Sequence, residues 1–307
     1  MKINVIFTGG TIGSVYGDGY ISPDSKEKYR LIENYKKKFG ESVQFEARSP
    51  YTILSENLTG KVLNTLVADV KEALKTDCDG IIIAHGTDTL QYSACAVAYS
   101  LGSETKPIVF VSAQYPLENP LTNGNINFEA AVEFIKQSGK TGVYVSYSND
   151  LKTVDIHFAT RLLRHGEYDH KVFSLNGPCA TYNNGTIALN DEFVKEDITK
   201  PSEKAFSNTS GILNITASPF EEYNYSLEGA RAVVFTPYHS GTLNTSSAEF
   251  KAFCKKANEA SVPLYVTGVT KGGEYQSMKE YSDLCIIPVY DTTSIALIVK
   301  LWLNIYF

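Results

Sequence analysis

Two turns in the sequence place threonine and aspartate side chains where they could bind a small charged substrate. The chain begins MKINVIFTGGTIGS, in which Thr11 follows two glycines at the end of an apolar run. A second apolar run, GIIIA, ends in the sequence HGTDT, residues 85–89. The carboxylate of Asp88 is a natural partner for a substrate ammonium group, and a threonine hydroxyl beside it can position or deliver a water. The two turns therefore form the centre of a candidate site.

Both turns also have structural explanations that involve no ligand. Gly9 and Gly10 permit a tight turn in any protein, and TGGTIG has neither the spacing of a GxGxxG motif nor the lysine of a P-loop. Asp88 or Thr89 could simply cap the helix expected after them. Capping requires one such residue, whereas HGTDT contains several, so the cluster favours a site.

Two further segments carry polar side chains near predicted strand or helix ends. The run ending in VSAQ, residues 111–114, is one of them. The other contains Ser55, which could cap a helix or donate to a substrate carboxylate. Ligands of open α/β sheets bind at the carboxyl ends of the strands, which is where we expect these segments.

Strand-like and helix-like segments alternate, and this alternation determines where the polar turns lie. Runs of valine and isoleucine predict buried parallel strands, and apolar residues at helical spacing predict helices that cover them. Thr59 is expected to cap one helix. The predicted strands are residues 2–7, 80–86, 107–114, 141–149, 211–216, 230–241, 262–269 and 285–289, and the predicted helices are 25–40, 59–75, 90–101, 123–139, 246–260 and the C-terminal segment.

This pattern predicts an α/β fold with two domains. A large N-terminal domain, residues 1–190, should contain a mostly parallel sheet flanked by helices. After Asn183 the sequence is polar and aperiodic, which indicates a connecting hairpin or a linker; we place the linker at residues 191–211. A smaller α/β domain should follow at residues 212–307.

Composition excludes some classes of protein. The chain has 307 residues, 28 Lys and Arg against 34 Asp and Glu, and a net charge of −6, so non-specific binding to nucleic acid is not expected. No segment approaches the ~18 apolar residues of a membrane span, and the N-terminus lacks a signal-peptide pattern. The five cysteines are scattered without a CxxC pair, which predicts no metal site and a reducing, cytoplasmic location.

The motifs TGGTIG and HGTDT, in this order, resemble those of the bacterial-type L-asparaginase family. The segments GYI, SENL, SAQYPL and NGNINFEAAVEF are similar to its cytosolic type I branch. The resemblance implies a large α/β domain, a linker, a smaller α/β domain and a homodimer or homotetramer. It also implies hydrolysis of the side-chain amide of L-asparagine to L-aspartate and ammonia without a cofactor.

The resemblance also assigns roles to residues. Thr11 would be the nucleophile that forms an acyl-enzyme, and Tyr20, on a mobile N-terminal loop, would help to activate it. Thr87 would assist with the hydroxyl or the water, and Asp88 would hold the α-ammonium group. A threonine hydroxyl is a weak nucleophile without a neighbouring base, so such assistance is needed.

Three more residues complete the predicted substrate site. Ser55 would hold the α-carboxylate, Glu56 would lie near the ammonium group, and the main chain of Ala113 would contact the amide. An amide is a poor electrophile, and each oxyanion donor typically contributes about 3 kcal/mol.

The sequence departs from the family pattern at a basic residue. The family has a lysine, in an N-R-x-x-K stretch, beside the second threonine and the aspartate. Here the alignment puts Arg161 on the family arginine and Arg164 on the lysine, so Arg164 joins the predicted catalytic residues. Arginine does not lose its proton, so it could serve electrostatically but not as a proton relay. Lys152 or Lys171 could also reach the site, and both arginines could instead be surface residues of a loop.

Two smaller features bear on the site. Asn123-Gly124 stands where many relatives have Asp-Gly. The histidines at 157, 165 and 170 are expected to lack a serine or cysteine partner, so no catalytic triad is predicted.

Two alternatives to asparagine hydrolysis remain. The protein could act on glutamine or another amide, although the absence of an extra basic domain argues against a tRNA-linked one. It could also bind an amino acid without turnover, because the family lysine is replaced.

Overall fold

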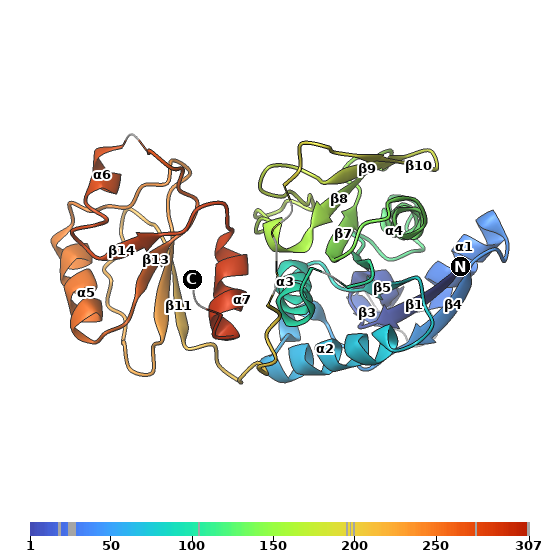
Figure 1. Cartoon of the computed structure of the whole chain (residues 1–307), viewed down its shortest axis with the longest axis horizontal. Coiled ribbons are helices and arrows are strands. Elements are labelled where there is room, and N and C mark those ends of the chain that lie inside the picture. Colours follow the sequence, from blue (N-terminus) through green and yellow to red (C-terminus); the bar gives the residue numbers. More distant parts are fainter. Residues whose placement is uncertain are drawn as a thin grey trace. The chain divides into compact units, whose positions relative to one another are not determined.

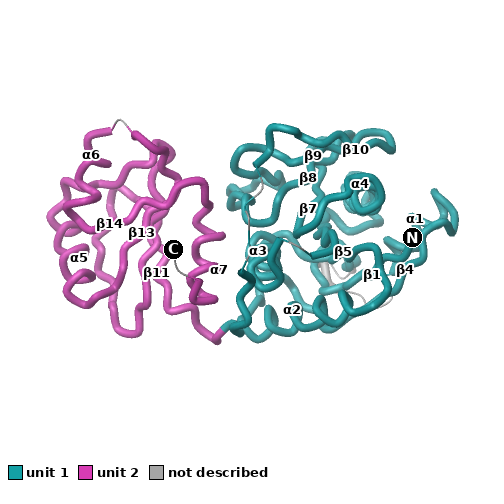
Figure 2. Tube along the Cα trace, viewed as in Figure 1, with its two compact units in different colours: residues 1–206 teal, residues 207–307 magenta. Residues whose placement is uncertain are grey.

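The computed structural model describes residues 1–17, 20–23, 29–103, 105–194, 196, 198, 200–273 and 275–305, without the side chains of residues 16, 17 and 20–23. The chain divides into two compact units, Met1–Phe206 and Ser207–Phe307, which Figure 2 colours separately. Each unit has its own sheet and its own hydrophobic core.

An eight-stranded mixed sheet is the centre of the first unit as far as it is described. Its order is β10-β9-β8-β7-β6-β5-β1-β4, with parallel pairing from β4 to β7 and antiparallel pairing from β7 to β10. The strands are β1 (Lys2–Phe7), β4 (Gln44–Arg48), β5 (Gly80–Ala84), β6 (Ile108–Val111), β7 (Val143–Tyr147), β8 (Val154–Phe158), β9 (Ala180–Asn183) and β10 (Thr186–Leu189). A separate hairpin of β2 (Ser14–Gly17) and β3 (Tyr20–Pro23) follows β1. The predicted mostly parallel sheet is confirmed.

Helices cover both faces of this sheet (Figure 1). They are α1 (Arg30–Phe39), α2 (Gly60–Leu74), α3 (Leu90–Leu101) and α4 (Gly124–Gln137). Because side chains alternate along a strand, Ile3, Val5 and Phe7 of β1 form one core with residues of α1 and α4. Helices α2 and α3 pack against each other on the opposite face.

The strand order places a topological switch at the centre of the sheet. After β1 the chain adds β4 on one side, and it then returns to add β5 on the other side of β1. Ligands of such sheets bind in the crevice at the carboxyl ends of the strands where the order reverses. Thr11 and HGTDT follow β1 and β5, so both predicted turns lie at this switch.

The sequence pattern does not predict β8, β9 or β10 as strands. Asp155 and His157 interrupt the apolar run of β8, and the side chains of β10 are mostly exposed at the edge of the sheet. A turn at Asn184 and Gly185, with φ of 45° and 85°, joins β9 to β10. The polar stretch after Asn183 could be a hairpin or a linker, and the structure shows that its first part is a hairpin.

The second unit is a smaller α/β structure. Its four parallel strands, in the order β11-β12-β13-β14, are β11 (Ile212–Thr216), β12 (Ala232–Thr236), β13 (Leu264–Val266) and β14 (Ile286–Pro288). Its helices are α5 (Ala248–Glu259), α6 (Gln276–Lys279) and α7 (Ser294–Trp302). No helix in the described part of either unit has the length and apolar character needed to cross a membrane.

Candidate active site

The turns after β1 and β5 meet through their glycines. A Cβ atom on Gly10 would lie 2.2 Å from the Cα atom of Gly86, and Gly10 has a φ of 76°, which other residues disfavour. Only glycine lets the two main chains approach so closely. Thr11 directly follows Gly10 and Thr87 directly follows Gly86, so the structure brings together the two turns that carry the predicted threonines.

A third segment, the one before Ser55, joins this contact. The N–H of Gly10 donates to the carbonyl of Ile53 at 3.1 Å, and the N–H of Ile53 donates to the carbonyl of Thr8 at 3.1 Å. A Cβ atom on Gly86 would lie 2.6 Å from the Cβ atom of Ser55. Main-chain contacts therefore hold three segments, distant in sequence, in one cluster, which we call the glycine junction.

Polar side chains at the glycine junction bond to groups within the junction rather than capping the helices that follow. The hydroxyl of Ser55 donates to Oδ2 of Asp88 at 3.1 Å, and the hydroxyl of Thr89 donates to the carbonyl of Ser55 at 2.8 Å. Helix α3 has no side-chain cap from Thr89, and α2 is capped by Thr59, as predicted. Capping therefore does not explain Ser55 or Thr89.

The accessibility of these groups suits a ligand. Thr11 and Thr87 are half-buried, Asp88 is exposed, and Ser55 is buried beneath them. Asp88 also precedes the N-terminus of α3, where the helix dipole favours a negative charge. The junction thus presents the hydroxyls of Thr11 and Thr87 and the carboxylate of Asp88 to solvent, above buried residues.

His85, to which the sequence assigns no role, is fully buried beneath this cluster. Its Nδ1 lies 2.8 Å from the carbonyl of Gly86, which can only accept, so Nδ1 carries the proton. Burial lowers the pKa of His85 to about 4. A neutral imidazole therefore fixes the carbonyl of Gly86 at ordinary pH.

Ala113, after β6, also lies close to the first turn. A Cβ atom on Gly124 would lie 3.0 Å from the Cβ atom of Ala113 and 3.5 Å from Cγ1 of Ile12, next to Thr11. Ala113 is closed to solvent in this structure. Its N–H and C=O have no hydrogen-bond partner within the described part of the chain.

Arg164 lies beside the first turn of α3. Burial raises the pKa of Tyr92, and the charge of Arg164 lowers it, so the two side chains are near each other. The side chain of Gln91 donates to the carbonyl of Leu163 at 3.4 Å, which attaches the same loop to α3. Arg164 is exposed, and Tyr92, on which its charge acts, follows Thr87 and Asp88 by five and four residues in the sequence.

Arg161 has a different environment. It is buried, and its charge acts on Tyr99, whose pKa is raised by burial and by Glu196. Thr160 donates to the carboxylate of Glu196 at 2.6 Å. The explanation of the two arginines as a surface pair is therefore wrong for Arg161, because its guanidinium lies in a buried network behind α3.

Other predicted residues take no part in these contacts or have side chains outside the described residues. The side chain of Tyr20 is outside the described residues. Glu56 is exposed and makes no hydrogen bond with another described side chain. Lys152 and Lys171 are exposed on the loops after β7 and β8.

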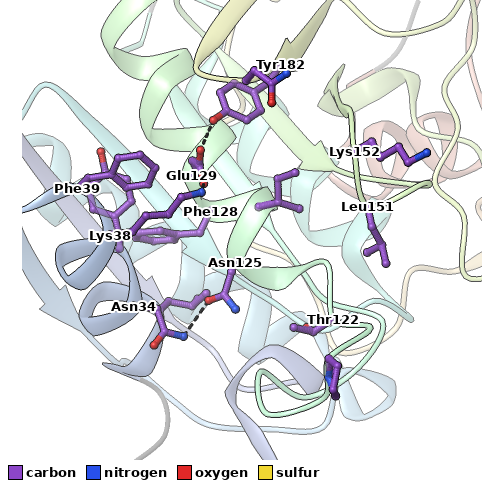
Figure 3. Close-up of a pocket in the computed structure, with 15 residues that line it drawn as sticks. Asn34, Lys38, Phe39, Thr122, Asn125, Phe128, Glu129, Leu151, Lys152 and Tyr182 are labelled. Carbon is purple, nitrogen blue, oxygen red and sulfur yellow. Dashed lines mark hydrogen bonds and ion pairs between the residues drawn. The ribbon is translucent and has the colours of Figure 1, made fainter.

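A cavity of about 350 Å³ lies elsewhere, between α1, α4 and the β9–β10 turn (Figure 3). Its walls include an ion pair of Lys38 with Glu129 at 2.7 Å and a hydrogen bond between Asn34 and Asn125 at 2.9 Å. Lys152 also lines it, but no predicted catalytic or substrate-binding residue does. The chemistry predicted from the sequence therefore does not belong to this cavity.

One expectation about histidine is wrong. Nδ1 of His157 lies 2.8 Å from the hydroxyl of Ser174, so this histidine does have a serine partner. The hydroxyl of Ser174 donates to the carbonyl of Gly177 at 2.7 Å, and both side chains are buried. The pair therefore closes a turn. Among the described residues, no group of histidine, cysteine, aspartate and glutamate could hold a metal ion.

Known proteins are similar to this chain over most of its length. The family model described as asparaginase, N-terminal, matches residues 2–195. A glutamyl-tRNA(Gln) amidotransferase subunit from Methanosphaera stadtmanae is 29% identical over 221 residues, which cover 70% of this chain and 49% of that protein. The same-named subunit from Methanococcus vannielii is 25% identical, over 98% of this chain and 73% of that protein. The chain thus matches about half the length of the relative from Methanosphaera stadtmanae.

Solved structures show the same fold. The thermostable L-asparaginase of Thermococcus kodakarensis has a TM-score of 0.75 at 21% identity, covering 98% of this chain and 92% of that one. L-asparaginase I of Vibrio cholerae has a TM-score of 0.77 at 21% identity, covering 97% and 90%. A probable cytoplasmic L-asparaginase of Campylobacter jejuni has a TM-score of 0.78 at 17% identity, covering 99% and 94%. The chain belongs to the asparaginase family.

Proposed function

We propose that this protein hydrolyses L-asparagine to L-aspartate and ammonia through an acyl-enzyme on Thr11. The observation that supports the proposal is the contact of Gly10 with Gly86, because Thr11 and Thr87 directly follow these two glycines. Two hydroxyls at the carboxyl ends of adjacent strands can act on the same carbonyl group of a substrate. Family membership supports amide hydrolysis as the reaction.

The reaction would proceed in two steps. The Thr11 oxygen attacks the side-chain amide carbon, and the C–N bond breaks as the nitrogen leaves with a proton as ammonia. Water then attacks the resulting ester, which releases L-aspartate and restores the threonine hydroxyl. Tyr20 and Thr87 would assist the proton transfers, since neither step proceeds well without a base.

The substrate would be held by its α-amino and α-carboxylate groups. Its ammonium group would bind Asp88, with Glu56 nearby, and its carboxylate would accept from Ser55. The Ser55 hydroxyl now donates to Asp88, but a hydroxyl rotates freely and can turn to a bound carboxylate. The main chain of Ala113 would contact the amide.

Arg164 would act through its charge. A guanidinium stays protonated, so it cannot relay a proton as a lysine can. Its position beside Tyr92, at the first turn of α3, supports an electrostatic role on Thr87 and Asp88.

L-Glutamine is the second candidate substrate. The two relatives described above are named as subunits of an amidotransferase, and an amidotransferase needs an amide as its nitrogen source. Glutamine is one methylene longer than asparagine. A pocket distinguishes such a pair by only about 10–200-fold, so one site can serve both.

Assembly and location follow the same family pattern. A homodimer or homotetramer in the cytoplasm is the proposal, with no cofactor, nucleic acid or membrane as partner. A solved neighbour titled as a probable cytoplasmic L-asparaginase supports the location.

The test is ammonia release by the purified protein from L-asparagine and from L-glutamine. We expect release from at least one, and a loss of at least about 1000-fold in Thr11→Ala and in Thr87→Ala. Full rates in both variants would refute the site. Binding of L-aspartate without ammonia release in the wild type would instead indicate a protein that lost turnover.

A further inference from the structure

The ends of β6 and β7 are joined by side chains, beyond the point where regular pairing stops. The last paired residues are Val111 of β6 and Ser146 of β7. After them the main chains run into the loops that carry Ala113 and Ser148. Two asparagines bridge these loops.

Asn127 makes the first bridge. Its Nδ2 donates to the carbonyl of Ser112 at 2.9 Å, and its Oδ1 accepts from the N–H of Ser148 at 2.8 Å. One side chain thus bonds a main-chain acceptor on one strand end and a main-chain donor on the other.

Asn123 makes the second bridge in the opposite sense. Its Oδ1 accepts from the N–H of Gln114 at 3.0 Å, and its Nδ2 donates to the carbonyl of Ser148 at 2.9 Å. The main-chain partners determine which end of each amide is oxygen and which is nitrogen.

Both asparagines are fully buried and lie four residues apart at the start of α4, so they share one face of the helix. Their bonds hold the residue before Ala113 and the residue after it. We call this arrangement the amide clamp. Asparagine suits it because one side chain must both donate and accept; an aspartate, which many relatives have at position 123, can do so only when it is protonated.

We propose that Asn123 and Asn127 are positioning residues that hold the main chain of Ala113 against the reacting amide of the substrate. This inference rests on the proposed function and names the residues that hold Ala113 in place for its contact with the amide. Neither asparagine touches the substrate, so their effect is confined to how well the amide is polarised and oriented.

The test compares an amide with an ester. L-Aspartate formation is measured from L-asparagine and from L-aspartate β-methyl ester, for the wild type, Asn127→Asp and Asn123→Leu, the last of which can neither donate nor accept. If glutamine is the better substrate, L-glutamine and its γ-methyl ester replace them. An ester is more reactive than an amide and depends less on polarisation.

The matched control is Asn125→Asp. Asn125 lies on the same helix, between the two clamp residues, but bonds Asn34 at the cavity of Figure 3. It therefore introduces the same charge into the same turn without touching the clamp.

We expect kcat/KM for the amide to fall about 100-fold in Asn127→Asp and Asn123→Leu, and that for the ester to fall less than about 10-fold. The control should keep the wild-type ratio of the two rates. Both rates come from the same folded molecules, so partial unfolding cancels from the ratio.

Equal losses for amide and ester in both clamp variants would refute positioning and leave a purely structural role. An unchanged ratio and rate would refute it as well. A wild type that turns over neither amide would instead refute the proposed function, and the inference with it.

Discussion

The first unit joins its strand ends in two different ways. At the glycine junction, the turns after β1 and β5 touch through main-chain atoms, with Gly10 and Gly86 leaving no room for a side chain. At the amide clamp, the loops after β6 and β7 are separated, and two buried asparagine side chains span them.

The difference teaches how the two kinds of functional group are positioned. The junction carries the side chains proposed for chemistry, Thr11 and Thr87, on main chains that cannot shift without a clash. The clamp holds a main chain, that of Ala113, by bonds that a single polar substitution can weaken. Steric change should therefore damage the first, and polar change the second.

Gly10→Ala should have the largest effect, because it attacks the junction. The new Cβ atom would lie 2.2 Å from the main chain of Gly86, at a φ of 76°. We expect a loss of about 2–4 kcal/mol of unfolding free energy and at least about 100-fold in kcat/KM. Urea unfolding and ammonia release would measure the two losses.

Gly13→Ala is the control for this steric argument. Gly13 belongs to the same TGGTIG motif, has no positive φ, and a Cβ atom there would meet no atom of the described residues within 4 Å. Its unfolding midpoint and activity should stay close to those of the wild type. Equal damage in both variants would contradict the account of the junction.

Acid should weaken the first unit through two buried histidines, one at the junction and one in the antiparallel strands. Burial lowers the pKa of both His85 and His157 from 6.5 to about 4. Between these values the unfolded chain binds protons that the folded chain does not, so stability falls as pH drops from about 6.5 to about 4. Each histidine should contribute a slope of up to about 1.4 kcal/mol per pH unit.

Urea unfolding at several pH values would measure this slope. His157→Gln should reduce it without altering activity, whereas His85→Gln should reduce it and also lower activity, because His85 bonds the carbonyl of Gly86. The same slope in the wild type and both variants would mean that other groups cause the acid sensitivity.

Arg164 tests whether charge alone is needed beside the junction. Arg164→Ala should lower kcat about 10-fold, equivalent to about 1.4 kcal/mol, and Arg164→Lys should stay within about 3-fold of the wild type. A large gain in Arg164→Lys would instead indicate that the site needs a group able to release its proton.

Thr59→Ala should have the smallest effect and should spare both regions. The hydroxyl of Thr59 accepts from the N–H of Val62 at 3.3 Å and caps α2. We expect a loss of about 1 kcal/mol in unfolding free energy and unchanged ammonia release. A fall in activity would indicate that α2 positions the junction.

The sequence predicts the buried parallel strands β1, β5, β6 and β7 well because each is a continuous apolar run between turn residues. It does not predict β8, because Asp155 and His157 break its run, nor β10, which is an exposed edge strand. Such strands are specified by their neighbours in the sheet rather than by their own pattern.

The site is predicted only as far as local motifs reach. Thr11 and the HGTDT turn can be named because each follows an apolar run. Their contact through Gly10 and Gly86 depends on strand order, which no local pattern contains. The role of Asn127 has no local signal for the same reason, although its spacing from Asn123 places both on one helix face.

The most direct test of the central claim is to trap the acyl group. Purified protein would be mixed with L-asparagine, quenched in acid within milliseconds and digested, and the peptides analysed by mass spectrometry. The account predicts an aspartyl ester on the peptide containing Thr11 and none in Thr11→Ala, which should also release no ammonia. Turnover by Thr11→Ala, or an acyl group on another residue, would contradict it.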